Sequence, residues 1–232
     1  MEVLIFVGFI VLFILAAWLA YRAKKKRRLA LQAFATQYGM TYSVEDPYGL
    51  LSYSFALFGR GDGRGIENVL SGAWQECPVK AADYWYYTES TDSKGHRTKT
   101  YHHFSVAVVD VALGLPPVTM QREGFFTRLA DHMGFRDIDF ESEAFNRAWN
   151  VKAEDREFAF KLVDARMMHF LMSTEGFGYE VCGPWLLVYS KRLKPTELIP
   201  LLGSAKGFRD QIPRLVWNEY GNASQTKEGS TP

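Results

Sequence analysis

The stretch VLIFVGFIVLFILAAWLAY, which runs from Val3 to Tyr21, decides how the rest of the chain is organised. It contains no charged side chain. As an α-helix it would be about 28 Å long, close to the hydrocarbon thickness of a bilayer, which is about 30 Å. A helix also satisfies each backbone amide within its own segment, as a lipid environment requires. The stretch therefore predicts a transmembrane anchor.

A cluster of basic residues follows this anchor directly. A cleaved signal peptide would carry basic residues before its apolar segment, where this chain has only Met1 and Glu2. By the positive-inside bias, the cluster places the N-terminus outside the cell and the following residues in the cytoplasm. Each Lys or Arg near the surface attracts anionic lipid by about 1 kcal/mol. We expect a single-pass protein of the inner (plasma) membrane, with membrane lipids as partners of the anchor and of this basic collar: Arg22, Lys24, Lys25, Lys26, Arg27 and Arg28.

The rest of the chain differs in charge from the anchor region. With the collar and Glu2 set aside, it holds 21 basic and 25 acidic residues, a formal net charge of −4. Nucleic-acid binding depends on concentrated Lys and Arg, so we expect no nucleic-acid partner. The two cysteines, Cys77 and Cys182, lack metal-site spacing and suit a reducing compartment as small core residues. We expect no cofactor.

The periodicity of apolar residues predicts an α+β fold, with a mixed, mostly antiparallel sheet and packed helices after the transmembrane helix. Period-two alternation predicts strands at 53–58, 66–74, 78–89, 98–111, 118–123 and 150–153, and a hairpin of 179–182 with 185–190 across Gly183-Pro184. Helical spacing predicts helices at 125–133, at 155–173, from Pro195 with interruptions at Pro200 and Gly203, and at 208–220 with a kink at Pro213. The chain is predicted to divide into an anchor with its collar at 1–28 and an amphipathic stem and linker at 29–45, in which Gly39 ends the helix. A cytoplasmic domain follows at 46–220, with candidate subdomains near 46–134 and 135–220. The last residues, 221–232, are predicted to be a disordered tail.

The most aromatic segments are the strands on either side of Ser90–Arg97. A turn centred near Lys94 would set the aromatic residues of the two strands opposite one another on both faces of a hairpin. One interpretation is an exposed aromatic platform for a protein partner, and the other is a sheet buried on both faces. The candidate binding residues are Tyr84, Trp85, Tyr86, Tyr87, Tyr101, His102, His103 and Phe104.

Two polar motifs have weaker implications. GRGDGRG, at 59–65, has the glycines of a phosphate-binding loop but no following Lys-Ser/Thr pair, and a tight hairpin loop is the simpler interpretation. In DIDFESE, alternate carboxylates on a strand would form a metal site from Asp137, Asp139 and Glu141. The simpler account buries Ile138 and Phe140 and places the glutamates in the first turn of a helix.

The stretches IDFESEAFNRAWNV and DREFAFKLVDARMMHFLM, together with the basic run, GRGDGR leading to NVLSG, and DYWY, resemble a group of single-pass, membrane-anchored actinobacterial proteins of unknown function. The similarity covers nearly all of residues 1–220 and implies a bacterial host. It brings no catalytic residues, and the sequence itself contains no GxSxG, HExxH or Walker motif. The leading hypothesis is thus a membrane-tethered cytoplasmic binding or scaffold module that is not an enzyme. The alternative is a metal-dependent enzyme acting on a lipid or sugar-phosphate at the membrane surface.

Overall fold

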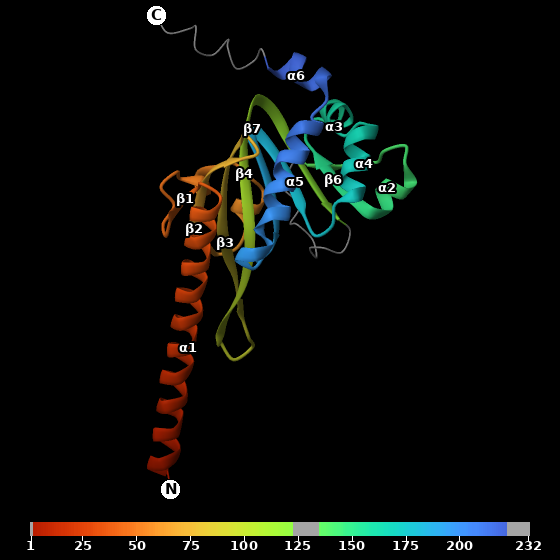
Figure 1. The fold of residues 1–232 in the computed structure, drawn as a ribbon. Helices are drawn as coiled ribbons and strands as arrows, with labels where there is room; N and C mark the ends of the chain where they lie inside the picture. Colours follow the sequence, from red (N-terminus) through yellow and green to blue (C-terminus); the bar gives the residue numbers. More distant parts are fainter. Residues whose placement is uncertain (1, 123–134, 222–232) are drawn as a thin grey trace, which may run out of the picture.

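The computed structural model describes residues 2–122 and 135–221 of the chain. Its first element is α1 (Glu2–Gln37), a single helix whose N-terminal part projects far from the rest of the molecule (Figure 1). From Phe6 onward, the apolar part of α1 buries none of its side chains and is long and apolar enough to cross a membrane. Its last turns bury Leu31, Phe34 and Ala35 in the domain, and Gly39 ends it with φ of +65°. The predicted anchor and stem are therefore one continuous helix.

The domain is built on one antiparallel sheet. Its strands run in the order β1-β2-β3-β4-β6-β5, and β7 also pairs with β4. The long β4 binds β3 through its first half and β6 through its second half, so the sheet joins both halves of the chain. This arrangement confirms the predicted α+β class. The strands are β1 (Thr41–Ser43), β2 (Gly63–Trp74), β3 (Cys77–Thr91), β4 (Arg97–Arg122), β5 (Arg136–Asp137), β6 (Trp149–Ala153) and β7 (Gly178–Lys191).

Helices and short turns cover the sheet. Ser142, Asp155 and Asp164 each accept a hydrogen bond from the backbone N–H three residues later, which caps α2, α3 and α4. The elements are the 3-10 turns η1 (Leu50–Ser52), η2 (Leu57–Gly59) and η3 (Pro195–Glu197), and the helices α2 (Glu143–Ala148), α3 (Arg156–Leu162), α4 (Ala165–Ser173), α5 (Leu198–Gln211) and α6 (Arg214–Tyr220).

The two faces of the sheet carry separate hydrophobic clusters. On β3, Val79 and Ala81 belong to the cluster that holds the stem of α1 and the helices α3 to α6, which we call the helix face. Ala82 and Tyr84 point the opposite way, into a smaller cluster closed by η1 and η2, which we call the loop face. Strand alternation thus sorts neighbouring residues of β3 between two cores.

Several predicted boundaries are wrong. Residues 53–58 do not form a strand, because Phe55, Leu57 and Phe58 all pack beneath the sheet as part of the loop-face cluster. The predicted helix at 155–173 is two helices, since Asp164 caps a new one after Val163. The helix predicted at 125–133 lies outside the described residues, as does the tail from residue 222.

The C-terminal part of the chain differs from its prediction at three points. The predicted hairpin across Gly183-Pro184 is wrong: β7 continues through both residues, and Gly183 takes a positive φ of +56° where the pairing with β4 shifts register. Pro200 and Gly203 do not interrupt α5. The single helix predicted at 208–220 with a kink at Pro213 is divided, because residues 208–211 belong to α5 and Pro213, whose ring cannot continue the hydrogen-bonded ladder, precedes α6.

Candidate functional site

The β3–β4 hairpin projects from the domain, and its strands pair as the sequence predicts. Tyr84 lies opposite Phe104, and Tyr86 lies opposite His102. On the other face, Trp85 and Tyr87 lie opposite His103 and Tyr101 respectively. The register is therefore confirmed, and each face of the hairpin has its own aromatic set.

The set on the loop face is part of the core. Tyr84, Tyr86 and Phe104 are buried there with η2. The Tyr84 hydroxyl donates to the Leu57 carbonyl oxygen at 2.8 Å, and burial raises its pKa well above the ordinary tyrosine value. His102 is half-buried and stacks on Tyr86 with 4.7 Å between ring centroids. These residues of the predicted platform are structural.

The set on the helix face is partly open to solvent. We call it the aromatic strip: Trp85, Tyr87, Tyr101 and His103. Tyr101 is 52% exposed, and its ring centroid lies 5.9 Å from that of Trp85 and 5.4 Å from that of Tyr87. His103 stacks parallel to Tyr101, and burial beside Arg192 lowers its pKa, which favours the neutral imidazole. The strip is a continuous surface of packed rings in which Tyr101 and His103 are exposed and Trp85 and Tyr87 are half-buried.

Glycines form the floor on which the strip rests. Gly63 and Gly65 of β2 pair with Tyr87 and Trp85, and a Cβ added at Gly65 would lie 2.8 Å from the Trp85 ring. The two rings therefore lie over bare backbone. The GRGDGRG segment leads from η2 into β2, so it is not the hairpin loop that the simpler interpretation predicts. Its Arg64 donates to the Phe58 carbonyl oxygen at 2.6 Å, an intramolecular contact.

At the base of the strip, the helix α1 is joined to the sheet by charge. Arg27 donates to both oxygens of the Asp83 carboxylate, from Nε at 2.7 Å and from Nη2 at 2.5 Å, and from Nη1 to the Leu193 carbonyl oxygen at 2.7 Å. Asn68 and Arg192 also donate to Asp83, at 2.9 and 3.2 Å. The Asp83 side chain is 6% exposed. We call this arrangement the anchor joint.

The anchor joint engages one cation of the basic collar within the protein. Arg27 is committed to Asp83, and Lys24 and Arg28 lie 2.7 and 3.9 Å from the Glu67 carboxylate. Arg22 lies over the Trp18 ring, at 4.7 Å. Lipid binding by the collar remains a prediction, and it fits best the cations that face away from the sheet.

The DIDFESE carboxylates lie apart from the strip. Ile138 and Phe140 are buried, as the simpler account predicts, while Asp137, Asp139 and Glu141 are exposed. Asp137 accepts a hydrogen bond from Asn150 and lies 3.7 Å from Lys152. Within residues 2–122 and 135–221, no three metal-ligating side chains gather closely enough to hold an ion.

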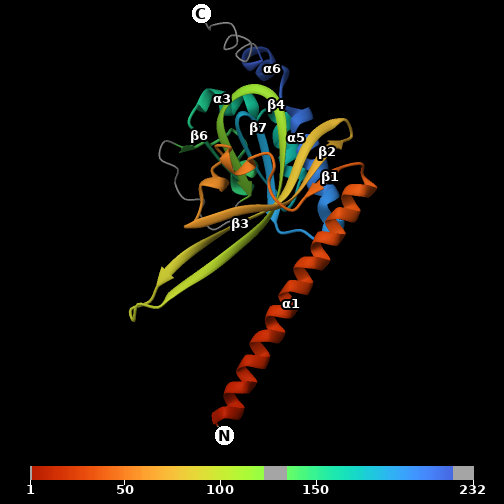
Figure 2. The same ribbon diagram turned by 90° about the vertical axis from the view of Figure 1, so that its left-hand side faces the viewer.

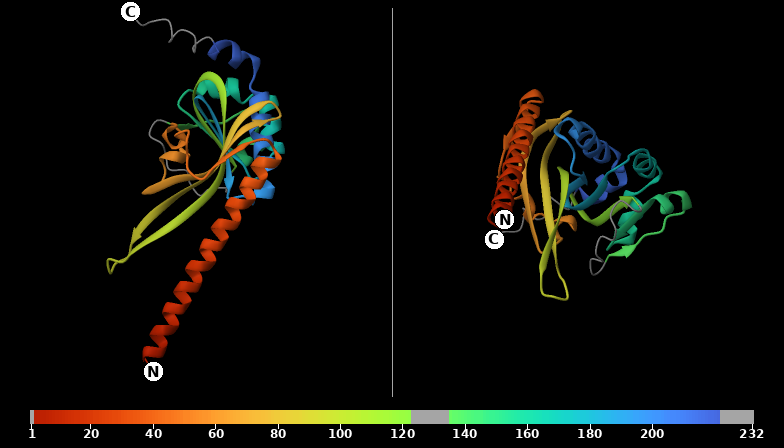
Figure 3. Two further views of the ribbon diagram at one scale, coloured as in Figure 1. Left: turned by 60° about the vertical axis from the view of Figure 1, so that its left-hand side comes forward. Right: turned by 90° about the horizontal axis from the view of Figure 1, so that it is seen from below.

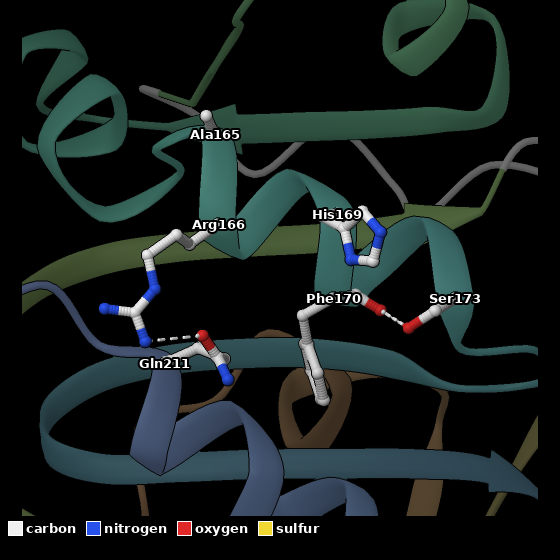
Figure 4. Close-up of a pocket in the computed structure, with 6 residues that line it drawn as sticks. All are labelled: Ala165, Arg166, His169, Phe170, Ser173 and Gln211. Carbon is white, nitrogen blue, oxygen red and sulfur yellow. Dashed lines mark hydrogen bonds between the residues drawn. The ribbon is translucent and has the colours of Figure 1, made fainter.

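Two hollows in the domain carry polar side chains away from the strip. The first, about 490 Å³, is a shallow depression between α4 and α5, where Arg166 donates to Gln211 at 3.2 Å and His169 points outward (Figure 4). The second, about 220 Å³, contains the buried Glu180 carboxylate. Glu180 accepts the Leu57 N–H at 3.1 Å, and burial raises its pKa to about 8. Arg166 and Glu180 therefore each have a hydrogen-bond partner within the protein.

Sequence reasoning did not identify Asp83 or Glu180. Each is a lone acid within an apolar or aromatic strand, in KAADYWYY and GYEVC. A charged residue in such a setting is buried only when it is paired or hydrogen-bonded, so the pattern itself was a signal of an internal contact. Arg27, the partner of Asp83, is one of the six cations of the basic collar, and the sequence does not distinguish it from the other five.

A solved structure shares the fold of this chain. No family model matches the chain, and no curated protein sequence matches it. The structure is similar to the crystal structure of the mycobacterial trehalose monomycolate transport factor A, TtfA, with a TM-score of 0.59 and 15% sequence identity, over 81% of this chain and 95% of that chain. At this identity the similarity establishes a shared fold, and the mycobacterial source agrees with the actinobacterial resemblance of the sequence.

Proposed function

We propose that the chain is a single-pass protein of the bacterial inner membrane whose cytoplasmic domain is a binding module that serves lipid transport as a scaffold. The aromatic strip is its contact surface, and its partner is a component of the same membrane. The N-terminus lies outside and the domain inside, because the basic collar follows the apolar part of α1.

The observation that carries this proposal is the position of the strip beside the anchor. Asp83, which holds Arg27 of α1, and Trp85 lie two residues apart on β3 and share the helix face of the sheet. The strip is thus the uncovered continuation of the surface on which the anchor docks. Exposed rings held by a fixed scaffold are typical of a recognition surface.

The similarity to TtfA supports a role in lipid transport rather than catalysis. That protein is described as a transport factor for trehalose monomycolate, and its chain matches this one along most of its length. The alternative, a metal-dependent enzyme using Asp137, Asp139 and Glu141, has no comparable support, since these exposed side chains do not converge in the described part of the chain.

A genetic complementation experiment tests the proposal. Deletion of the gene in its host should reduce the amount of newly labelled envelope lipid that reaches the cell surface. The wild-type chain and Tyr48→Ser, which removes an exposed ring elsewhere, should restore it. The double variant Trp85→Ser, Tyr101→Ser should not, although it reaches normal levels in the membrane. Unchanged lipid delivery in the deletion strain would refute the proposal.

A further inference from the structure

The β3–β4 hairpin extends toward the same side of the domain as the apolar part of α1. Figure 2 shows both arms leaving the domain and diverging downward, and the left-hand view of Figure 3 agrees. The apolar part of α1 is the segment long enough to cross a membrane. When it does so, the hairpin is directed at the surface of that membrane.

The aromatic strip occupies the face of the hairpin that is turned toward α1. Arg27 of α1 reaches Asp83 on this face, and Trp85, then Tyr87, follow outward along the same face of β3. Nearer the base, the helix face is covered by the stem of α1 and by α5. Beyond Asp83, Trp85 and Tyr87 are half-buried and Tyr101 is exposed, so the strip borders the wedge between α1 and the hairpin.

The chemistry of this face matches a layer of lipid headgroups. Trp and Tyr favour the membrane interface because one part of each ring system is apolar and another part is polar. Arg97 and Lys99 continue the face toward the tip, and the Lys99 ammonium lies 4.2 Å from the centre of the Tyr87 ring. Glu89 is paired with Lys99 at 3.1 Å, and Asp92 is hydrogen-bonded to His96 within the tip. From Tyr84 to Phe104 the hairpin carries three cations, Lys94, Arg97 and Lys99, against the two acids Glu89 and Asp92, a formal net charge of +1.

We infer that the aromatic strip, with Arg97 and Lys99, lies on the anionic headgroups of the membrane in which α1 is anchored. This inference rests on the proposed function and names the partner of its contact surface. The domain then touches the bilayer at two places, the anchor and the hairpin. The membrane surface is favoured over a protein partner because the hairpin extends to the same side of the domain as the apolar part of α1.

Photocrosslinking tests the inference with the full-length chain. A benzophenone amino acid replaces Tyr101, or Tyr48 as a control, since Tyr48 packs near Lys80 away from the strip and both side chains are substantially exposed. Each chain is reconstituted alone in vesicles of phosphatidylcholine or of phosphatidylcholine with phosphatidylglycerol, irradiated, and analysed by mass spectrometry. We expect lipid adducts at position 101 in several-fold excess over position 48, and more of them with phosphatidylglycerol.

Charge variants, and crosslinking in irradiated cells, distinguish a lipid contact from a protein contact at the strip. Arg97→Gln with Lys99→Gln should lower the adduct yield in anionic vesicles to the level in phosphatidylcholine, whereas Lys80→Gln should not. Equal yields at positions 101 and 48 in vesicles would overturn the inference. If irradiated cells then gave a protein adduct at 101, the proposed function would stand with a different partner. Absence of lipid and protein adducts at 101 in cells would overturn both.

Discussion

The Arg27 guanidinium and the Asp83 carboxylate form a two-point contact, with two nitrogens donating to two different oxygens, across 56 positions of sequence. Breaking such a buried pair leaves the remaining charge without its partner and costs about 3 kcal/mol. We therefore expect Asp83→Ala to lower the free energy of unfolding by about that amount, measured by urea unfolding of the detergent-solubilised chain. Lys24→Ala removes a solvent-exposed pair with Glu67 and should cost less than about 1 kcal/mol. Equal costs for the two variants would contradict the buried joint.

The hairpin residues should divide by face in their effect on stability. Tyr84 is fully buried and donates a hydrogen bond, so Tyr84→Ala should cost about 3 kcal/mol or more. Tyr101 is half exposed, so Tyr101→Ala should cost less than about 1 kcal/mol. The same unfolding assay measures both. A large loss in the Tyr101 variant would mean that the strip is part of the core.

The glycine floor of the strip should not tolerate a methyl group. Gly65→Ala would push the Trp85 ring out of place, and we expect a loss of about 1 to 3 kcal/mol. Gly203 lies within α5 with open space around it, so Gly203→Ala should instead stabilise the protein by up to about 1 kcal/mol. Thermal unfolding of the two variants beside the wild type shows whether the signs differ as stated.

Glu180 should make stability depend on pH. Its pKa rises from 4.5 to about 8 on folding, so the folded state retains a proton that the unfolded state loses. The stabilisation is complete below about pH 4.5 and is lost as pH rises to about 8, with a slope of up to about 1.4 kcal/mol per pH unit. Glu180→Gln should flatten this part of the stability curve. Glu154→Gln, at the rim of the same cavity, is the control and should leave the slope in place.

The orientation in the membrane is open to a direct test. A green fluorescent protein fused after Pro232 should fluoresce, and alkaline phosphatase fused there should be inactive, because the domain is expected in the cytoplasm. Active phosphatase would reverse the orientation and place the strip on the outer surface.

Local patterns in the sequence were sufficient for the elements that depend on them. The register of Tyr84 with Phe104 followed from the turn near Lys94, and the end of α1 followed from Gly39. The assignment failed at 53–58, where Phe55 and Phe58 are buried by contacts with distant strands. Composition could not distinguish a strand from a packed loop there, because both bury aromatic residues.

The candidate site was half predictable for a similar reason. The sequence identified both aromatic faces of the hairpin, but which face is exposed depends on what the rest of the chain places over each. Tyr84 is covered by η2, whereas Trp85 lies over glycine. The anchor joint depends on contact between Arg27 of α1 and Asp83 of β3. Residues this far apart in the sequence are brought together by the fold, so their spacing along the chain does not predict the contact.

The helix α1 runs unbroken from the apolar segment into the domain, and the Arg27–Asp83 contact fixes it there. A helix of given hydrophobic length tilts more in a thin bilayer than in a thick one. Since the helix and the domain turn together, such a tilt swings the hairpin toward or away from the surface. In the proposed arrangement, bilayer thickness would therefore set how far the aromatic strip lies from the membrane surface.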